Sequence, residues 1–170
     1  MKLTIVINGA GGVGKDTLCL AVANKYYTMN VSSIDPIKEA AKHLGWDEKK
    51  DLASRKFLSD LKSLSVNYND WPTKYLVSKY KEFKDGHFQI LFVHIREGKE
   101  IDHFKTLVND DVITLLIRRA SVEMEYGNKS DDDVENYEYD YIYNNDMPLN
   151  ESKEAFISFI ETIIEKECKE

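Results

Sequence analysis

The sequence predicts an α/β protein built on a doubly wound, five-stranded parallel sheet, in one domain that spans residues 1–170. Strand-like and helical segments alternate along the chain, without a linker or a repeat between them. Two of the expected strands, residues 88–94 and 112–117, are nearly continuous apolar runs, which is typical of strands buried on both faces of a parallel sheet. A chain of 170 residues is long enough to bury the core that such a sheet needs.

The first expected element is a strand over residues 2–7, because this run is apolar and rich in β-branched side chains. A glycine-rich stretch follows it. We then expect a helix over residues 16–27, where apolar residues recur at helical spacing, and a short strand around residues 31–34.

Three helices are expected between the second and third strands, over residues 35–43, 51–64 and 70–83. Pro36 and Pro72 fall in the first turns of two of them, where proline is well tolerated. This stretch therefore forms a helical insertion between two strands of the sheet.

The remaining elements are a strand over residues 88–94, a helix over residues 99–108, a strand over residues 112–117 and a last strand over residues 139–143. A polar tract, residues 120–138, precedes the last strand. A closing amphipathic helix is expected to pack onto the sheet. Its apolar residues are Phe156, Phe159, Ile160, Ile163 and Ile164.

The stretch between the first strand and the first helix carries the clearest chemical signal. Residues 9–17 read Gly-Ala-Gly-Gly-Val-Gly-Lys-Asp-Thr, which fits Gly-x-x-x-x-Gly-Lys with Gly9, Gly14 and Lys15 at the fixed positions. Glycines let the backbone turn its N–H groups inward as a nest for oxyanions, and the lysine reaches terminal phosphates as a mobile charge. A strand, a glycine loop and a helix in this order aim the helix N-terminus at the phosphates.

The residue after the lysine departs from the strict pattern. That pattern has Ser or Thr there, whose hydroxyl binds Mg²⁺, whereas this chain has Asp16 followed by Thr17. A carboxylate is also a good ligand for a hard cation, so we expect Asp16 to bind the ion directly or through water. The alternative is that Asp16 only caps the helix.

Composition limits the partners. The net charge of −7 and the isoelectric point near 5.2 argue against nucleic acid, because phosphate backbones demand a basic face. An acidic protein that binds a polyanion needs a focused positive site, and arginine is the side chain best suited to bidentate phosphate contact. The chain has nineteen lysines and only four arginines. These are Arg55, Arg96, Arg118 and Arg119.

Cys19 and Cys168 lie far apart in the sequence without metal-ligand spacing, so we expect reduced thiols in a cytoplasmic protein. The sequence shows neither a signal peptide nor a run of 18 apolar residues, so we expect no membrane partner.

Four segments match, in order and spacing, the motifs of a known group of enzymes. Residues 14–17 read Gly-Lys-Asp-Thr and residues 35–39 read Asp-Pro-Ile-Lys-Glu. Residues 94–100 read His-Ile-Arg-Glu-Gly-Lys-Glu, and residues 144–146 read Asn-Asn-Asp. On these segments the chain resembles the P-loop nucleoside monophosphate kinase superfamily, and most of all the deoxynucleoside monophosphate kinases of phages and bacteria.

His94 is the main departure from that family, which often has Asp-x-Arg-x-x-x-Glu at residues 94–100. The family's aspartate would help to hold Mg²⁺ through water, and a neutral imidazole is a poor partner for that ion. Either Asp16 or Asp35 compensates, or His94 holds a phosphate or an internal hydrogen bond.

The resemblance implies a P-loop NTPase fold of the nucleotide-kinase type, with ATP and Mg²⁺ as cofactors and Asp16 as the metal ligand. It places the nucleotide on Gly9, Gly11, Gly12, Val13, Gly14, Lys15, Asp16, Thr17 and Asn145. It places catalytic cations at Lys15, Arg118 and Arg119, the two arginines lying at the start of a short lid over about residues 118–138. We expect one of these two arginines to face solvent.

The acceptor side follows from the same resemblance. The helical insertion, about residues 35–86, would bind the acceptor through Asp35, Lys38, Arg55 and Arg96. Glu100 is expected to pair with Arg96. Asp35 could instead cap its helix, and Arg55 could be a solvated helix residue.

The function implied is ATP-dependent transfer of a phosphoryl group to a small phosphorylated acceptor, in the first place a (deoxy)nucleoside monophosphate. Alternatives are dephospho-coenzyme A kinase, another small-molecule kinase, or a nucleotide-binding regulator of the same fold without turnover. The expected partners are the nucleotide and the acceptor, with the protein a monomer or a homodimer.

Overall fold

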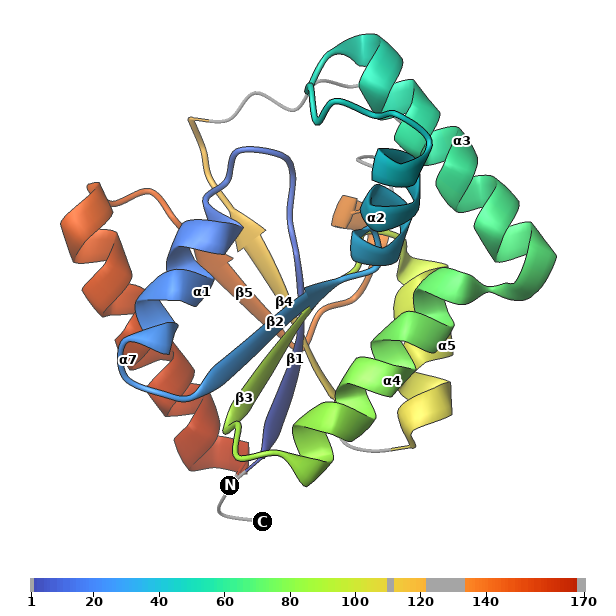
Figure 1. Ribbon diagram of the computed structural model, residues 1–170. Helices are drawn as coiled ribbons and strands as arrows, with labels where there is room; N and C mark the ends of the chain where they lie inside the picture. The colour runs from blue at the N-terminus through green and yellow to red at the C-terminus, as the bar shows by residue number, and fades with distance from the viewer. Residues whose placement is uncertain (1, 110–111, 122–133, 168–170) are drawn as a thin grey trace.

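The computed structural model describes residues 2–109, 112–121 and 134–167 (Figure 1). Within them, five strands form one parallel sheet in the order β2-β3-β1-β4-β5. The strands are β1 (Leu3–Asn8), β2 (Thr28–Ser32), β3 (Ile90–His94), β4 (Val112–Arg118) and β5 (Tyr141–Asn144). The fold class predicted from the sequence is confirmed.

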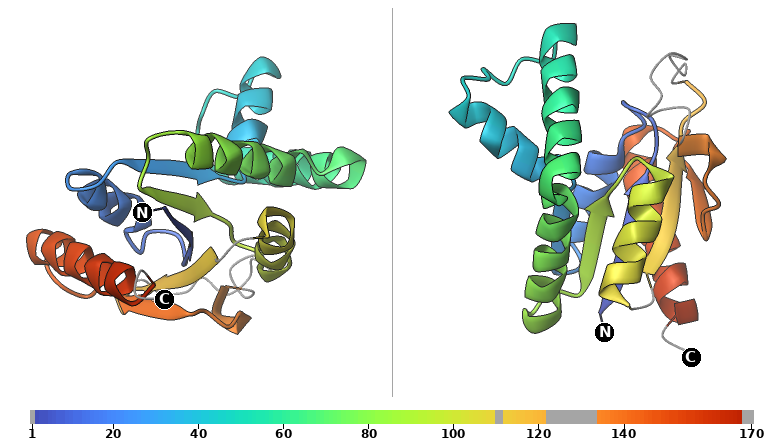
Figure 2. Two further views of the ribbon diagram at one scale, coloured as in Figure 1. Left: turned by 90° about the horizontal axis from the view of Figure 1, so that it is seen from below. Right: turned by 90° about the vertical axis from the view of Figure 1, so that its right-hand side faces the viewer.

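Helices cover both faces of this sheet (Figures 1 and 2). One face carries α1 (Lys15–Ala23) and α7 (Leu149–Glu167), and the other carries α4 (Trp71–Asp85) and α5 (Gly98–Val108). The remaining helices, α2 (Asp35–His43) and α3 (Leu52–Asn69), follow β2. None of the helices in the described parts of the chain is both long and apolar enough to cross a membrane.

The central strand shows why the apolar runs of the sequence have no alternation. Every residue of β1 is buried, because neighbouring side chains point to opposite faces and both faces are covered. Ile5 and Ile7 pack with Phe156 of α7, whereas Val6 packs with Phe104 of α5.

Several element boundaries differ from the prediction. The first helix ends at Ala23 rather than at residue 27, because Asn24 and Lys25 form a turn that leads into β2 three residues earlier than expected. In the insertion, α3 continues to Asn69, since no glycine or proline stops it, and ends where Asp70 adopts a left-handed backbone at φ 53°. The third strand begins at residue 90 rather than 88, and the last strand covers residues 141–144 rather than 139–143.

The two ends of the sheet have different roles. Both chain termini lie at one end, and the loop after β1 lies at the other, together with α2 and α3 (Figure 1). All strands are parallel, so this second end collects the carboxyl ends of the strands, where doubly wound sheets bind ligands. Most of the predicted lid, residues 122–133, lies outside the described residues.

Candidate active site

The glycine loop between β1 and α1 has a backbone that only glycine adopts without strain. Gly9, Gly12 and Gly14 have φ angles of 145°, 82° and 95°. A Cβ atom on Gly9 would lie 2.4 Å from the carbonyl oxygen of Ile117, and one on Gly14 would lie 2.7 Å from Nδ2 of Asn145. The loop is therefore packed tightly against the end of β4 and the segment after β5.

The open side of the loop fits a chain of phosphates. Cβ atoms on Gly11 and Gly12 would meet nothing within 4 Å, and α1 begins immediately after the loop, so its N-terminal N–H groups face the same side. The Lys15 ammonium folds back and donates hydrogen bonds to the carbonyl oxygens of Gly9 and Ala10. Backbone donors and one mobile cation thus converge where a triphosphate would bind.

Asp16 and Thr17 occupy the first turn of α1. Gly14, not Asp16, is the N-cap residue, so the structure does not support the capping alternative for Asp16. Among the described residues no group of three or more His, Cys, Asp or Glu side chains could hold a metal by itself. Magnesium usually keeps several waters and binds one or two carboxylates together with substrate phosphates, and the exposed Asp16 fits that pattern.

Asn145 lies behind the loop rather than in front of it. Its side chain is 5% exposed, donates from Nδ2 to the carbonyl oxygen of Val13 at 2.8 Å, and accepts a hydrogen bond from the Ser152 hydroxyl. Its backbone N–H donates to the carbonyl oxygen of Arg118 at 2.7 Å. The predicted nucleotide contact of Asn145 stays a prediction, and the structure gives the side chain a supporting role for the loop.

The predicted acceptor residues come from two strand ends and two helices. Asp35 begins α2, and its Oδ2 accepts a hydrogen bond from the Ser32 backbone N–H at 2.7 Å. Arg96 follows β3, the neighbour of β2 in the sheet, and its side chain is exposed. Lys38 on α2 and Arg55 on α3 are also exposed, on the helices at the same end of the sheet (Figure 1).

Lys62 is a candidate that the sequence did not single out among nineteen lysines. It lies seven residues after Arg55, so the two share a face of α3. Its side chain is 15% exposed, and Nζ lies 2.8 Å from a Glu100 carboxylate oxygen and 3.4 Å from Oε1 of Glu97. Burial raises the pKa of Glu100, and the Lys62 charge opposes that rise. Lys62 is thus a bound partner of Glu100, which we had expected beside Arg96.

His94 lies at the carboxyl end of β3, between β1 and β2. Within the part of the chain that the structure describes, its imidazole makes no hydrogen bond. Burial is the main cause that lowers the pKa of His94, and the Lys15 charge adds to it. The carboxylates of Asp16 and Asp35 act in the opposite direction. The imidazole is therefore neutral at neutral pH and close to the loop lysine.

The two consecutive arginines have different environments. Arg118 ends β4 and binds the Glu135 carboxylate through Nε and Nη2, at 3.0 and 2.6 Å from Oε2. Arg119 is exposed and donates to the Ser121 hydroxyl at 3.1 Å, and no carboxylate among the described residues pairs with it. The charge of Arg118 is neutralised, so Arg119 is the arginine available to an anionic ligand.

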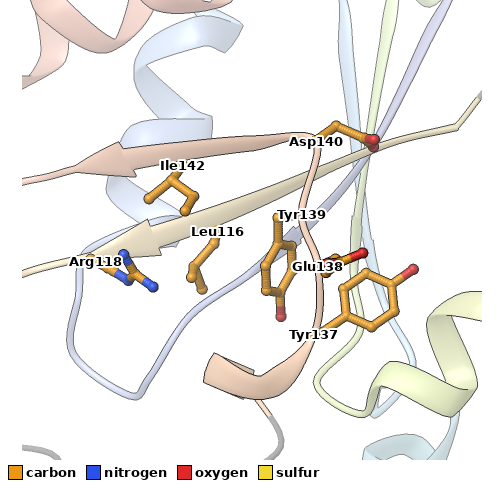
Figure 3. A pocket seen from close by; sticks show the side chains of 7 residues that line it. All are labelled: Leu116, Arg118, Tyr137, Glu138, Tyr139, Asp140 and Ile142. Carbon is orange, nitrogen blue, oxygen red and sulfur yellow. The ribbon is translucent and has the colours of Figure 1, made fainter.

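A cavity of about 490 Å³ lies elsewhere, beside β4 and the segment that leads into β5 (Figure 3). It is lined by Leu116, Arg118, Tyr137, Glu138, Tyr139, Asp140 and Ile142. No residue of the glycine loop lines it, so it is not the candidate phosphate site.

Comparisons with known proteins support the fold. No family model and no curated protein sequence matches the chain. Among solved structures, a tunicamycin resistance protein from Deinococcus radiodurans has a TM-score of 0.60 at 10% identity, covering 94% of this chain and 96% of that one. A putative kinase from Chloroflexus aurantiacus has a TM-score of 0.55 at 12% identity, covering 97% of both chains.

A sugar kinase from Janibacter sp. HTCC2649 has a TM-score of 0.53 at 14% identity, covering 95% of both chains. At such identities the likeness concerns the fold. The chain has the α/β fold of kinases of the P-loop type over almost its whole length.

Proposed function

We propose that this protein is an ATP-dependent phosphotransferase whose acceptor is a small phosphorylated molecule, in the first place a (deoxy)nucleoside monophosphate. The observation that carries the proposal is the glycine loop. Its left-handed glycines, the Lys15 ammonium and the start of α1 converge at the carboxyl end of the central strand. That arrangement binds the β- and γ-phosphates of a nucleotide in P-loop enzymes.

The similar solved structures favour transfer over a regulatory role. Those named as a sugar kinase, a gluconokinase and a shikimate kinase match almost the full chain with TM-scores of 0.53, 0.50 and 0.50. Small-molecule phosphorylation is thus a recurrent use of this arrangement of strands and helices. We extend it to this chain because its loop has the glycines and the lysine of the Gly-x-x-x-x-Gly-Lys pattern.

Phosphoryl transfer requires positioning and positive charge rather than covalent chemistry by the protein. When bound, Mg²⁺ neutralises the phosphate oxygens, and Asp16 would hold it together with water. Lys15 would leave the carbonyls of Gly9 and Ala10 and contact the terminal phosphates, while the Thr17 hydroxyl contacts a phosphate oxygen. Arg119 would approach the transferring group from the end of β4.

The acceptor side supports a phosphorylated acceptor, because Arg96, Arg55 and Lys38 are exposed there. Arg96 follows β3, and Arg55, Lys62 and Lys38 come from α3 and α2. We propose that Arg96 and Arg55 bind the acceptor phosphate. Asp35 would hydrogen-bond the acceptor or the water around the metal.

One observation favours a second candidate, a kinase whose acceptor is a hydroxyl, such as dephospho-coenzyme A kinase. His94 ends β3 and Asp35 follows the adjacent strand β2, and the Asp35 carboxylate accepts a hydrogen bond from the backbone of Ser32, which is paired with His94. A neutral imidazole or a carboxylate in this place can accept the proton of a hydroxyl nucleophile. A phosphate nucleophile needs no such base.

A coupled ADP-release assay tests the proposal. Mg·ATP is offered with a panel of nucleoside monophosphates, deoxynucleoside monophosphates and dephospho-coenzyme A, and the Lys15→Ala variant is the control. Turnover with a monophosphate, lost in the control, supports the first candidate, and turnover only with a hydroxyl acceptor supports the second. Binding of ATP without turnover on any acceptor contradicts both and favours a regulator.

A further inference from the structure

The side chain of Asn8 joins three separate parts of the molecule. Asn8 is the last residue of β1 and is 1% exposed. Its Oδ1 accepts a hydrogen bond from the Gly9 N–H at 2.8 Å, and its Nδ2 donates to the carbonyl oxygen of Arg96 at 2.9 Å and to the Tyr139 hydroxyl at 2.8 Å. The amide orientation follows from these partners, since the Gly9 N–H can only donate and the Arg96 carbonyl can only accept.

The three partners belong to different functional segments. Gly9 begins the glycine loop, Arg96 is the proposed acceptor arginine after β3, and Tyr139 lies in the segment that leads from the lid region into β5. In the sheet, the pairing of β1 with β3 ends at Ile7 and His94, and each strand then leads into its own loop. Asn8 bridges the point where these loops separate, so it fixes the start of one relative to the other.

The third partner is itself held in place. The Tyr139 hydroxyl donates to the carbonyl oxygen of Val134 at 2.9 Å while it accepts from Asn8. Burial raises the pKa of Tyr139 to about 12, so the phenol keeps the proton that it donates. Next to it, the Tyr137 hydroxyl donates to Asp102 of α5 at 2.8 Å, and its ring lies 2.7 Å from the place of a Cβ atom on Gly98.

Tyr137 thus attaches this segment to α5, and Tyr139 attaches it to the end of β1 through Asn8. The backbone of Arg96 is therefore fixed from the β1 side by Asn8 and adjoins a segment that is bound to α5. An exposed arginine on an unsupported loop would have a variable position relative to the donor loop.

We propose that Asn8 is a positioning residue that sets the distance between the donor loop and the acceptor arginine. The proposal rests on the proposed function, because it assigns the acceptor phosphate to Arg96. In-line transfer needs both phosphates in a fixed geometry, and a displacement of about 1 Å can lower the rate on the order of 10²-fold. Asn8 acts through Gly9 and Arg96 and touches neither substrate.

The variant Asn8→Asp tests this role. A carboxylate keeps the size of the amide and the oxygen that accepts from Gly9, but it loses both donated hydrogen bonds. We expect kcat/KM for the acceptor to fall by about 10- to 100-fold, while the KM for ATP changes by less than about threefold. In an Arg96→Ala background the same change should lower kcat/KM by less than about threefold more, because Asn8 acts through Arg96.

Two further variants control for a general loss of packing. Thr114→Val removes the two hydrogen bonds that the buried Thr114 hydroxyl of β4 makes with Asp140 and touches neither loop, so we expect unchanged kinetic constants. Tyr139→Phe removes one of the three partners and leaves the Arg96 contact, so its effect should be smaller than that of Asn8→Asp. Equal changes in the KM values for ATP and acceptor, or additive effects of Asn8→Asp and Arg96→Ala, would overturn the proposal.

Hydrogen exchange separates this inference from the proposed function. In Asn8→Asp we expect the amides of residues 96–98 to exchange faster, whereas those of residues 9–14 keep their rates, because the carboxylate still accepts the hydrogen bond from Gly9 but no longer donates one to Arg96. Faster exchange in residues 9–14 alone would overturn the link to Arg96. A wild-type protein without acceptor-dependent turnover would overturn the proposed function, and the exchange experiment would still decide whether Asn8 joins the two loops.

Discussion

Replacing Asn145 by alanine tests how the glycine loop keeps its shape. The Asn145 amide is 5% exposed and lies between the carbonyl of Val13 and the hydroxyl of Ser152. Alanine leaves both groups without these partners in a place closed to water. It also removes the Nδ2 atom that lies 2.7 Å from the position of a Cβ on Gly14, so the loop loses its support on that side.

The size of the effect follows from the number of groups left unpaired. A buried polar group that loses its partner costs about 1–3 kcal/mol. With two such groups, we expect Asn145→Ala to lower the free energy of unfolding by about 2–4 kcal/mol, since the Ser152 hydroxyl can rotate toward another acceptor. We also expect weaker ATP binding, because the backbone donors of the loop become less ordered.

Urea denaturation of Asn145→Ala measures this loss, with Asn144→Ala as the matched control. Asn144 is the preceding residue and its side chain is exposed, so its removal should change the free energy of unfolding by less than about 0.5 kcal/mol. Equal stabilities for the two variants would refute the supporting role of Asn145. Unchanged ATP affinity in a destabilised Asn145→Ala variant would show that the Asn145 side chain stabilises the fold without shaping the loop.

Four further substitutions give three separate predictions. Arg119→Ala should lower kcat by about 10³-fold in steady-state kinetics. Arg118→Ala should lower it by less than about tenfold, because Glu135 already neutralises that arginine. Equal losses would contradict the assignment of Arg119 as the catalytic arginine. Because the pKa of His94 is lowered in the folded state, this imidazole binds a proton more readily in the unfolded chain as the pH falls. The wild type should therefore lose stability below about pH 6.5, and His94→Gln should lose less. Urea denaturation at several pH values measures the difference. An equal loss of stability in the wild type and in His94→Gln would exclude His94 as the cause of the pH dependence. Lys62→Met should lower the free energy of unfolding by about 1–2 kcal/mol at neutral pH, because it leaves the Glu100 carboxylate without its cation and raises the pKa of Glu100 further. This loss should shrink as the pH falls and the Glu100 carboxyl is protonated. A loss independent of pH would contradict this explanation.

Much of the fold was predictable because its signals are local. The apolar runs of β3 and β4 and the amphipathic spacing of α7 lie within single segments, and the parallel sheet follows from their alternation. The ends of elements were less predictable. No apolar pattern marks residues 65–69 as helical, and the turn after Ala23 lacks both glycine and proline.

The candidate site likewise has a part that the sequence predicts and a part that it does not. The glycine loop lies in consecutive residues with strict spacing, so the sequence predicted it in full. The roles of Asn8 and Lys62 depend on partners 88 and 38 residues away, and no local pattern marks them. The sequence predicts different environments for Arg118 and Arg119, with one of them facing solvent, but only the structure shows which one Glu135 binds.

Transfer of a labelled phosphate from ATP tests the proposed kinase activity. ATP labelled at the γ-phosphate is incubated with Mg²⁺, the protein and a deoxynucleoside monophosphate, and the labelled products are separated. The proposed transfer predicts label in the deoxynucleoside diphosphate, and none there with Lys15→Ala. Label that stays in ATP, or passes only to inorganic phosphate, across every monophosphate tested would contradict it.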